Sequence, residues 1–290
     1  MRDADPQLRD VRSEDAEACA AVAFRAHAAV SAAHNFPPEL PSLAVVLRFI
    51  RSKVDDPNTL GFLIEKNGRI VGSIFLTIIP ECPVAAIGPL TVDPAAEGGM
   101  GRKLLQAALR GAHQIGLTEV RLIQSPMHLR SLALHTKAGF NVCEPLLSFE
   151  NAVPANAANG DGVRLATPDD VPRCQQICHK AYGFARTFEL NAAISQQIAT
   201  VVERDSEIVG YACGIGFRGH AVCETTEELK SLIAHSPKHP SAGFFVPARN
   251  GELLRWLFQH GVRALWPATL MASGGYQQPT SVFYLQWPFE

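Results

Sequence analysis

The seven cysteines of this chain include no CxxC pair, and their number is odd. A disulfide framework needs an even set at close spacing and a zinc ribbon needs CxxC pairs, so neither is expected, and the thiols are interpreted as reduced core residues. Long apolar runs are also missing, since no stretch reaches the roughly 18 apolar residues of a membrane span. The segment Met1–Asp10 is charged and lacks the basic-then-apolar order of a secretion signal. We therefore expect a cytoplasmic protein without a metal site.

An excess of charge of either sign is absent as well. Lys and Arg number 26 against 28 Asp and Glu, which gives a formal net charge of -2. Binding along nucleic acid or an anionic membrane depends on clustered positive charge, so neither partner is expected and any anion site must be local. The chain of 290 residues, 47% of them hydrophobic, is long enough for two domains of about 150 residues each.

What is present is an alternation of helical and strand-like patterns, which is typical of the α/β class. Ser13 is expected to end a first strand and to cap a helix that runs to about Val30. Asn67-Gly68 separates two β-rich runs, and this dipeptide is a strong hairpin signal. Further helices are expected at 43–54, 101–115, 129–137 and 253–259, and further strands at 84–92, 119–124 and 141–149.

The stretch Ile87–Leu105 has the pattern of a phosphate-binding turn. Pro94 ends its apolar strand because proline has no N–H to donate, and Gly98, Gly99 and Gly101 allow close backbone approach and positive φ. The helix that follows directs its free first-turn amides and the positive end of its dipole at whatever lies over the glycines. The sequence therefore predicts an anion site at this turn.

After residue 150 the pattern starts again. Residues 151–162 have almost no apolar bulk and are expected to form an exposed linker. Val163-Arg164 before a capped helix restates Val11-Arg12, and Val201–Gly210 matches Leu63–Gly72, so two copies of one fold are expected.

The second copy differs where the first has its glycine turn. Phe244–Glu252 stands there with one glycine, and we interpret it as a structural turn, although Arg249 and the amides of Asn250 and Gly251 have the chemistry to hold an anion. His220 and Glu224 have the chemistry to line a cleft between the copies, but a satisfied loop histidine is the favoured interpretation.

The strand, turn and helix at 87–109, together with Leu132–Phe140, resemble the GNAT N-acetyltransferase superfamily. In that family the pattern V-x-P, Gln or Arg, two residues, Gly-x-Gly or Gly-x-Ala binds the pyrophosphate of acetyl-CoA through its amides. Val92, Pro94 and Gly99-Met100-Gly101 match it, whereas Glu97 stands at the Gln or Arg position and one residue is missing after it. The resemblance implies an α/β (α+β) fold of two tandem GNAT-like domains, each a mixed, mostly antiparallel sheet flanked by helices. Residues 1–150 would bind acetyl-CoA, and residues 163–290 would be a degenerate copy.

The resemblance also implies site residues, position by position. Leu90 and Val92 would pair with the pantetheine arm through their backbone. The family's later motif, Asn-x-x-Ala-x-x-x-Tyr, is represented by His128, Ser131 and His135, of which the first two would contact the coenzyme. The contacts to the pyrophosphate would come from Glu97, Gly98, Gly99, Met100, Gly101, Arg102 and Lys103.

His135 takes the position of a tyrosine that commonly protonates the leaving CoA thiolate in this family. An unperturbed imidazole has a pKa near 6.5 and would be only partly protonated at pH 7, so an ordinary surface or half-buried histidine is an equal alternative. Glu81 is the candidate general base because it is the carboxylate nearest the strand before the turn, with Glu144 as another candidate.

The function that this resemblance implies is transfer of an acetyl group from acetyl-CoA to an amine of a small molecule by direct attack. The alternatives are a non-catalytic acyl-CoA-binding sensor or regulatory protein and, with less support, an interaction module without a ligand. Acetyl-CoA is the expected co-substrate, no metal is expected, and a homodimer is left open.

Overall fold

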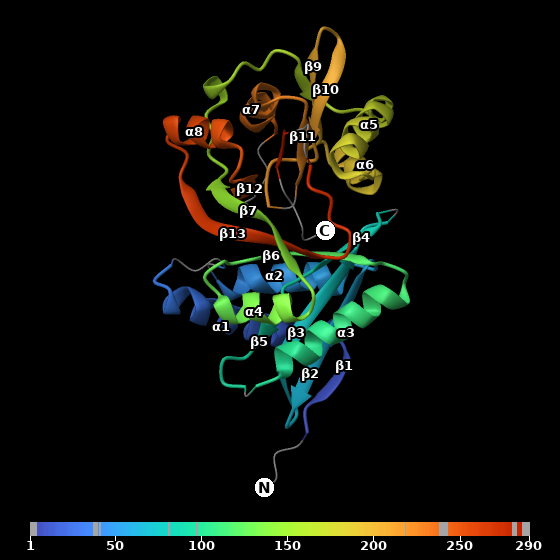
Figure 1. Ribbon diagram of the computed structural model, residues 1–290, viewed down its shortest axis with the longest axis vertical. Coiled ribbons are helices and arrows are strands. Elements are labelled where there is room, and N and C mark those ends of the chain that lie inside the picture. The colour runs from blue at the N-terminus through green and yellow to red at the C-terminus, as the bar shows by residue number, and fades with distance from the viewer. Residues whose placement is uncertain are drawn as a thin grey trace.

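The computed structural model describes residues 5–36, 40, 42–80, 82–96, 98–217, 219–237, 243–279 and 283–285. The chain forms two mixed or antiparallel sheets flanked by helices, with the first half of the chain below and most of the second half above in Figure 1. Within these described ranges, no helix has the length and hydropathy needed to cross a membrane. The α/β class, with mostly antiparallel pairing, is confirmed.

The first half contributes most of a nine-stranded sheet of order β1-β2-β3-β4-β6-β13-β7-β12, with β5 paired to β3. Its elements are β1 (Gln7–Asp10), α1 (Ala16–Ala33), α2 (Leu43–Val54), β2 (Thr59–Lys66), β3 (Arg69–Ile78), β4 (Val84–Ile87), β5 (Thr91–Val92), α3 (Met100–Gln114), β6 (Glu119–Gln124), α4 (Leu129–Lys137) and β7 (Asn141–Glu150).

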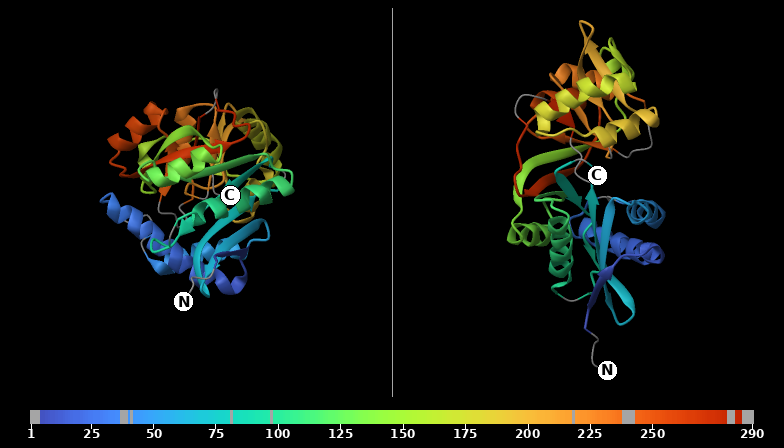
Figure 2. Two further views of the ribbon diagram at one scale, coloured as in Figure 1. Left: turned by 60° about the horizontal axis from the view of Figure 1, so that its bottom comes forward. Right: turned by 90° about the vertical axis from the view of Figure 1, so that its right-hand side faces the viewer.

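Alternation along the central strands decides which helix covers which face. Phe75 of β3 packs with α1 and α2, whereas Ile74 and Leu76 pack with α3. Phe140, which follows α4, belongs to the same core cluster as α3. The sheet therefore has an α1/α2 face and an α3/α4 face, which lie on opposite sides of it in the right-hand view of Figure 2.

The second half forms a five-stranded antiparallel sheet of order β14-β11-β10-β9-β8 and supplies β12 and β13 to the first sheet. Its elements are β8 (Val163–Leu165), α5 (Val171–Tyr182), α6 (Thr187–Ser195), β9 (Thr200–Arg204), β10 (Glu207–Ala212), β11 (Ala221–Cys223), α7 (Thr226–His235), β12 (Gly243–Pro247), α8 (Gly251–Gln259), β13 (Ala264–Ser273) and β14 (Phe283–Leu285).

A strand from the second half lies inside the sheet of the first. β13 pairs with β6 from Thr269↔Gln124 to Ser273↔Val120 and pairs along its other edge with β7, which in turn pairs with β12. Figure 1 shows β7 and β13 running together between the lower and upper parts of the molecule. The division into 1–150 and 163–290 stays a prediction, but the hydrogen-bonded sheet crosses that division.

The internal repeat is visible in the contacts. Arg9 is bound through both terminal nitrogens to Asp15 (2.7 and 2.9 Å), and Arg164 is bound in the same way to Asp170 (2.7 and 2.8 Å). Each arginine also contacts a glutamate of its hairpin, Glu65 or Glu203. Both arginines stand in the first strand of their half.

These contacts correct two details of the sequence analysis. Arg164 corresponds to Arg9 rather than to Arg12, and the first strand ends at Asp10 rather than at Ser13. The physical reason is that the Asp15 carboxylate accepts the Arg12 N–H (2.8 Å), which turns the chain into a 3-10 segment at Ser13–Asp15 before α1 begins.

The segment 151–162 is mostly exposed, as its composition predicts, but it also packs against the second half at two points. Val153 is 2% exposed and belongs to the core cluster of α7, α8 and β12. The Trp256 indole N–H donates to the Ala157 carbonyl (3.1 Å). Small residues such as Ala157 and Ala158 allow this segment to lie against α8, so its low apolar bulk permits packing instead of preventing it.

Candidate functional site

The sheet opens between β5 and β6. β4 runs parallel to β6 from Val84↔Glu119 to Ala86↔Arg121, and this pairing ends there, whereas β6 continues to Gln124. The chain after β4 is diverted by a cis Gly88-Pro89 peptide, and β5 then pairs with β3 in a register shifted by one residue. The continuous strand expected at 84–92 is therefore two strands, and in the described structure the second one does not pair with β6.

The backbone of β5 presents polar groups to this opening. The Asp93 N–H donates to the Val71 carbonyl (2.8 Å), and Thr91 stands opposite Ser73. Because antiparallel strands direct alternate residues at their partner, the N–H and C=O of Val92 face away from β3. Leu90 lies just before β5 and is half-buried. An extended ligand with amide groups fits such an edge.

The glycine turn caps α3 as the sequence predicts. Gly99 is the N-cap with φ of 90°, and the Lys103 N–H donates to the Gly99 carbonyl (3.1 Å). A Cβ at Gly98 or at Gly99 would meet no atom within 4 Å, so the space over the turn is open. The first turn of α3 contains no acidic residue, and Arg102 and Lys103 are exposed there. These features fit a diphosphate, which such amides and cations bind.

Gly101 has a different role in the turn. A Cβ at this position would lie 3.3 Å from Leu134 of α4 and 3.8 Å from Val92. Glycine thus lets α3 approach α4 and β5 closely. Met100 is 6% exposed and packs in the core, so its side chain is structural, and only its backbone can serve the turn. Glu97 and Glu81 lie outside the described residues.

His135 is buried in α4, with 4% of its surface exposed. Its Nδ1 lies 3.3 Å from the Ser131 hydroxyl, and its ring packs edge-on against Phe140. Burial lowers the pKa of His135 to about 4. The ring is therefore neutral at pH 7, and the imidazolium needed for a strong acid is a minor species there.

His128 and Ser131 lie at the start of α4. His128 is the N-cap of the helix, and both residues are half-buried. Ser131 is one turn before His135, so its hydroxyl is directed at the histidine ring. The predicted helix at 129–137 contains Ser131 and His135 and begins directly after His128, as observed. The contacts of these three residues to a coenzyme stay a prediction.

Gln124 ends β6, and the sequence analysis did not single it out. The residue is 9% exposed, and neither Nε2 nor Oε1 has a hydrogen-bond partner among the residues that the structure describes. A buried amide without partners is unusual in a folded protein. The signal that could have found it is a polar residue at the end of the strand Val120–Ile123, directly before the motif that begins at His128.

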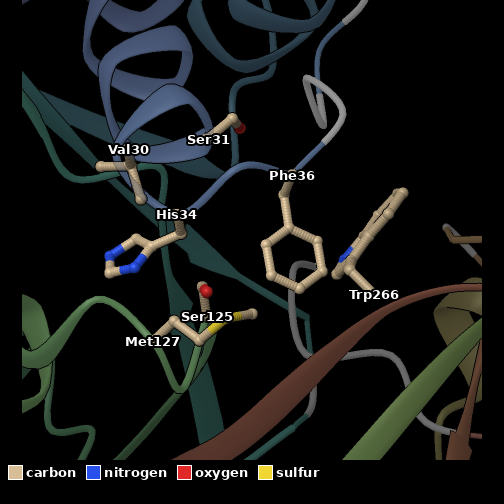
Figure 3. A pocket seen from close by; sticks show the side chains of 7 residues that line it. All are labelled: Val30, Ser31, His34, Phe36, Ser125, Met127 and Trp266. Atoms are coloured by element: carbon tan, nitrogen blue, oxygen red, sulfur yellow. The ribbon is translucent and has the colours of Figure 1, made fainter.

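A small hollow lies beside the opening on the α1/α2 side. Figure 3 shows Phe36, from the segment that follows α1, close to Trp266 of β13, with Met127 and Ser125 below them. The side chains that line it are Val30, Ser31, His34, Phe36, Ser125, Met127 and Trp266. None of the seven is a carboxylate, lysine or arginine, and four of them are apolar or aromatic. The sequence analysis missed Phe36 and Trp266, because their meeting depends on the insertion of β13.

The residues of the second half that have the chemistry to hold an anion form structural contacts. Arg249 donates through Nε to the fully buried Glu144 (2.8 Å) and through Nη2 to the Pro279 carbonyl (2.8 Å). The Asn250 side chain accepts the Leu253 N–H and so caps α8. This supports the interpretation of Phe244–Glu252 as a structural turn and gives Glu144 a structural partner.

The remaining candidates of the second half are also held by neighbours. His220 is 1% exposed, its Nε2 lies 2.9 Å from the Tyr211 hydroxyl, and burial lowers its pKa far below the usual value. Glu224 forms ion pairs with Arg204 (3.1 Å) and Arg173 (3.5 Å). The favoured interpretation of His220, a satisfied histidine, agrees with these contacts.

Comparison with known proteins agrees with this geometry. Residues 26–140 match the model of the acetyltransferase (GNAT) family. A putative acetyltransferase from Pyrococcus horikoshii is 17% identical, with 96% of this chain and 92% of that chain covered and a TM-score of 0.72. A GCN5-related N-acetyltransferase from Sphaerobacter thermophilus is 15% identical, with 94% and 96% covered and a TM-score of 0.60. Both show that the fold extends over nearly the whole chain. No curated protein matches the sequence.

Proposed function

Since residues 26–140 belong to the acetyltransferase (GNAT) family, we propose that this chain transfers an acetyl group from acetyl-CoA to an amine of a small molecule. The observation that carries the proposal is the open edge of β5 next to a glycine turn at the start of α3 with open space above it. One ligand that joins an extended amide-containing arm to a diphosphate would fill both features.

The coenzyme contacts fall on named groups of the chain. The backbone of Leu90 and Val92 pairs with the pantetheine arm, and the amides from Gly98 to Arg102 bind the pyrophosphate. Lys103 adds positive charge at the start of the helix. The charge of Glu97 would oppose a diphosphate, but the amides act whatever the side chains are.

The amine acceptor enters from the hollow lined by Phe36, Met127 and Trp266. Ser125, one of the residues that line this hollow, directly follows Gln124 at the end of β6, the strand that borders the opening. Because none of the seven described residues that line the hollow is a carboxylate, it favours an acceptor whose non-reacting part is apolar or aromatic over a polyamine.

The reaction that this arrangement serves is direct attack. The amine nitrogen forms a bond to the thioester carbonyl carbon, the carbon-sulfur bond breaks, and the thiolate leaves with the electron pair. Backbone N–H groups near Leu90 stabilise the carbonyl oxygen as negative charge develops. His135, neutral at pH 7, acts as a hydrogen-bond donor to the thiolate rather than as a strong acid. Glu81 stays the proposed base that takes the proton from the amine.

The burial of His135 favours one second candidate, a protein that binds acyl-CoA without turnover. Two measurements separate the candidates. Isothermal titration with acetyl-CoA should give a Kd well below 1 mM, in the range of about 1–100 µM, and release of CoA thiol should require an amine from a panel of apolar and aromatic amines. Binding without thiol release would favour the sensor, and a lack of binding at millimolar acetyl-CoA would contradict both.

A further inference from the structure

The amide of Gln124 is a buried polar group without a partner in the described part of the chain. Both its Nε2 and its Oε1 are shielded from solvent, and neither is hydrogen-bonded to any described residue. Such a group costs free energy on folding, and the cost disappears when a ligand supplies the missing partners. An unpaired buried amide such as that of Gln124 is typical of a residue that forms its hydrogen bonds with a bound ligand.

The position of Gln124 points to the opening between β5 and β6. It stands three residues beyond Arg121, where pairing between β4 and β6 ends, and its other neighbour is Thr269 of β13. Val120 and Leu122 pack on the α3/α4 face, and residues two apart share a face. The Gln124 amide thus stands on the same face as α4, which carries His135.

We propose that the Gln124 side chain binds a secondary amide of the pantetheine arm of acyl-CoA, an inference that rests on the proposed function. A primary amide offers two N–H donors and a carbonyl acceptor. A secondary amide offers one N–H and one carbonyl, and the pantetheine arm contains two such amides, so the arm supplies a partner for each of the two orphan atoms. A thioester has no donor and would leave Oε1 unpaired, and a phosphate would call for a cation.

The test compares the wild type with Gln124→Leu by isothermal titration with two probes, acetyl-CoA and CoA. Because both probes contain the pantetheine arm, we expect the Kd of each to rise by about ten-fold. In the absence of ligand the variant should melt no lower than the wild type, because leucine removes an unpaired buried amide. Gln124→Met provides a second variant of similar shape and should behave in the same way.

Gln175→Leu is the matched control. Gln175 of α5 is partnered, since its Nε2 donates to the Thr187 hydroxyl (2.6 Å). The same substitution there should lower the melting temperature of the free protein and leave both Kd values within about two-fold of the wild type.

The outcomes separate this inference from the proposed function. If the wild type binds both probes and the Gln124 variants bind them equally well, the inference is wrong and the proposed function stands. If only acetyl-CoA is weakened, Gln124 contacts the thioester, and the assignment to the pantetheine amide is overturned. If the wild type binds neither probe, the proposed function fails before any variant is compared, and this inference fails with it.

Discussion

Burial of His135 couples the stability of the protein to pH. The pKa is about 4 in the folded chain against 6.5 for an unperturbed imidazole. The unfolded chain therefore takes up a proton first as the pH falls. The stabilisation is fully present above about pH 6.5 and is lost progressively toward pH 4.

His135→Phe should remove this pH dependence. Between pH 7.5 and pH 5 the unfolding free energy of the wild type should fall by about 2 kcal/mol more than that of the variant, measured by urea unfolding. Changes in packing act equally at both pH values and cancel in this comparison. The exposed His113, replaced by Phe, should keep the wild-type dependence. Parallel pH profiles of the wild type and His135→Phe would contradict the assigned burial.

A substitution at Gly99 tests the anion site. Its φ of 90° and the open space at its Cβ mean that Gly99→Glu would project a carboxylate over the turn. Like charge near a diphosphate should weaken acetyl-CoA binding by about a hundred-fold or more, as measured by titration. Gly68→Glu is the control, because Gly68 also has positive φ (70°) and open space, but lies in the β2–β3 turn. Equal loss in both variants would assign the effect to backbone strain.

At the scale of elements, a carboxylate anchors the helix that follows the first strand of each half. Hydrogen bonds from Arg164 lower the pKa of Asp170 to about 2, and hydrogen bonds from Arg9 lower the pKa of Asp15. Depressed pKa values of this kind stabilise the fold above about pH 4, and the contribution is lost as the pH falls toward 2.

Asp170→Asn should therefore destabilise the protein by about 1–2 kcal/mol at pH 7, a value reduced for the solvent exposure of Arg164. Urea unfolding followed by circular dichroism measures it. Asp169→Asn, at an exposed position in the same turn, should change the unfolding free energy by less than about 0.5 kcal/mol. A similar loss in both variants would show that general charge, not this ion pair, is responsible.

At the scale of the whole molecule, β13 joins the two halves. A fragment that ends at residue 162 lacks β13, which lies between β6 and β7, and β12, which pairs with the other edge of β7. It therefore leaves one edge of β6 and both edges of β7 unpaired. We expect this fragment to lose the near-ultraviolet circular dichroism of a packed core and to bind no acetyl-CoA. Co-expression with residues 163–290 should restore both signals. Full binding by the fragment alone would mean that the first half is independent.

Local signals predicted helices at 43–54 and 129–137 and the strand at 119–124 with the observed ends. The hairpin at Asn67-Gly68 is confirmed by positive φ at both residues. These features depend on the chemistry of neighbouring residues, which a sequence displays directly.

Features that depend on distant partners could not be predicted. Nothing in the residues of β13 shows that it lies between β6 and β7, because an apolar strand pairs equally well with any edge of matching pattern. The meeting of Phe36 with Trp266, the burial of His135 and the unpaired amide of Gln124 all depend on this packing. The break between β4 and β5 at Gly88-Pro89 was not predicted either. A proline within an apolar run does not show which strand pairs with the residues before it and after it.

The insertion of β13 between β6 and β7 also determines when the sheet can be completed during synthesis. Gln124 leaves the ribosome long before Thr269, its partner across the sheet. The edges of β6 and β7 that pair with β13 therefore stay unpaired while the intervening residues are synthesised. Pairings of such long sequence separation form slowly and leave apolar surface exposed meanwhile. The site at the end of β6 is therefore assembled among the last parts of the molecule, and only in chains that have been translated through residue 273.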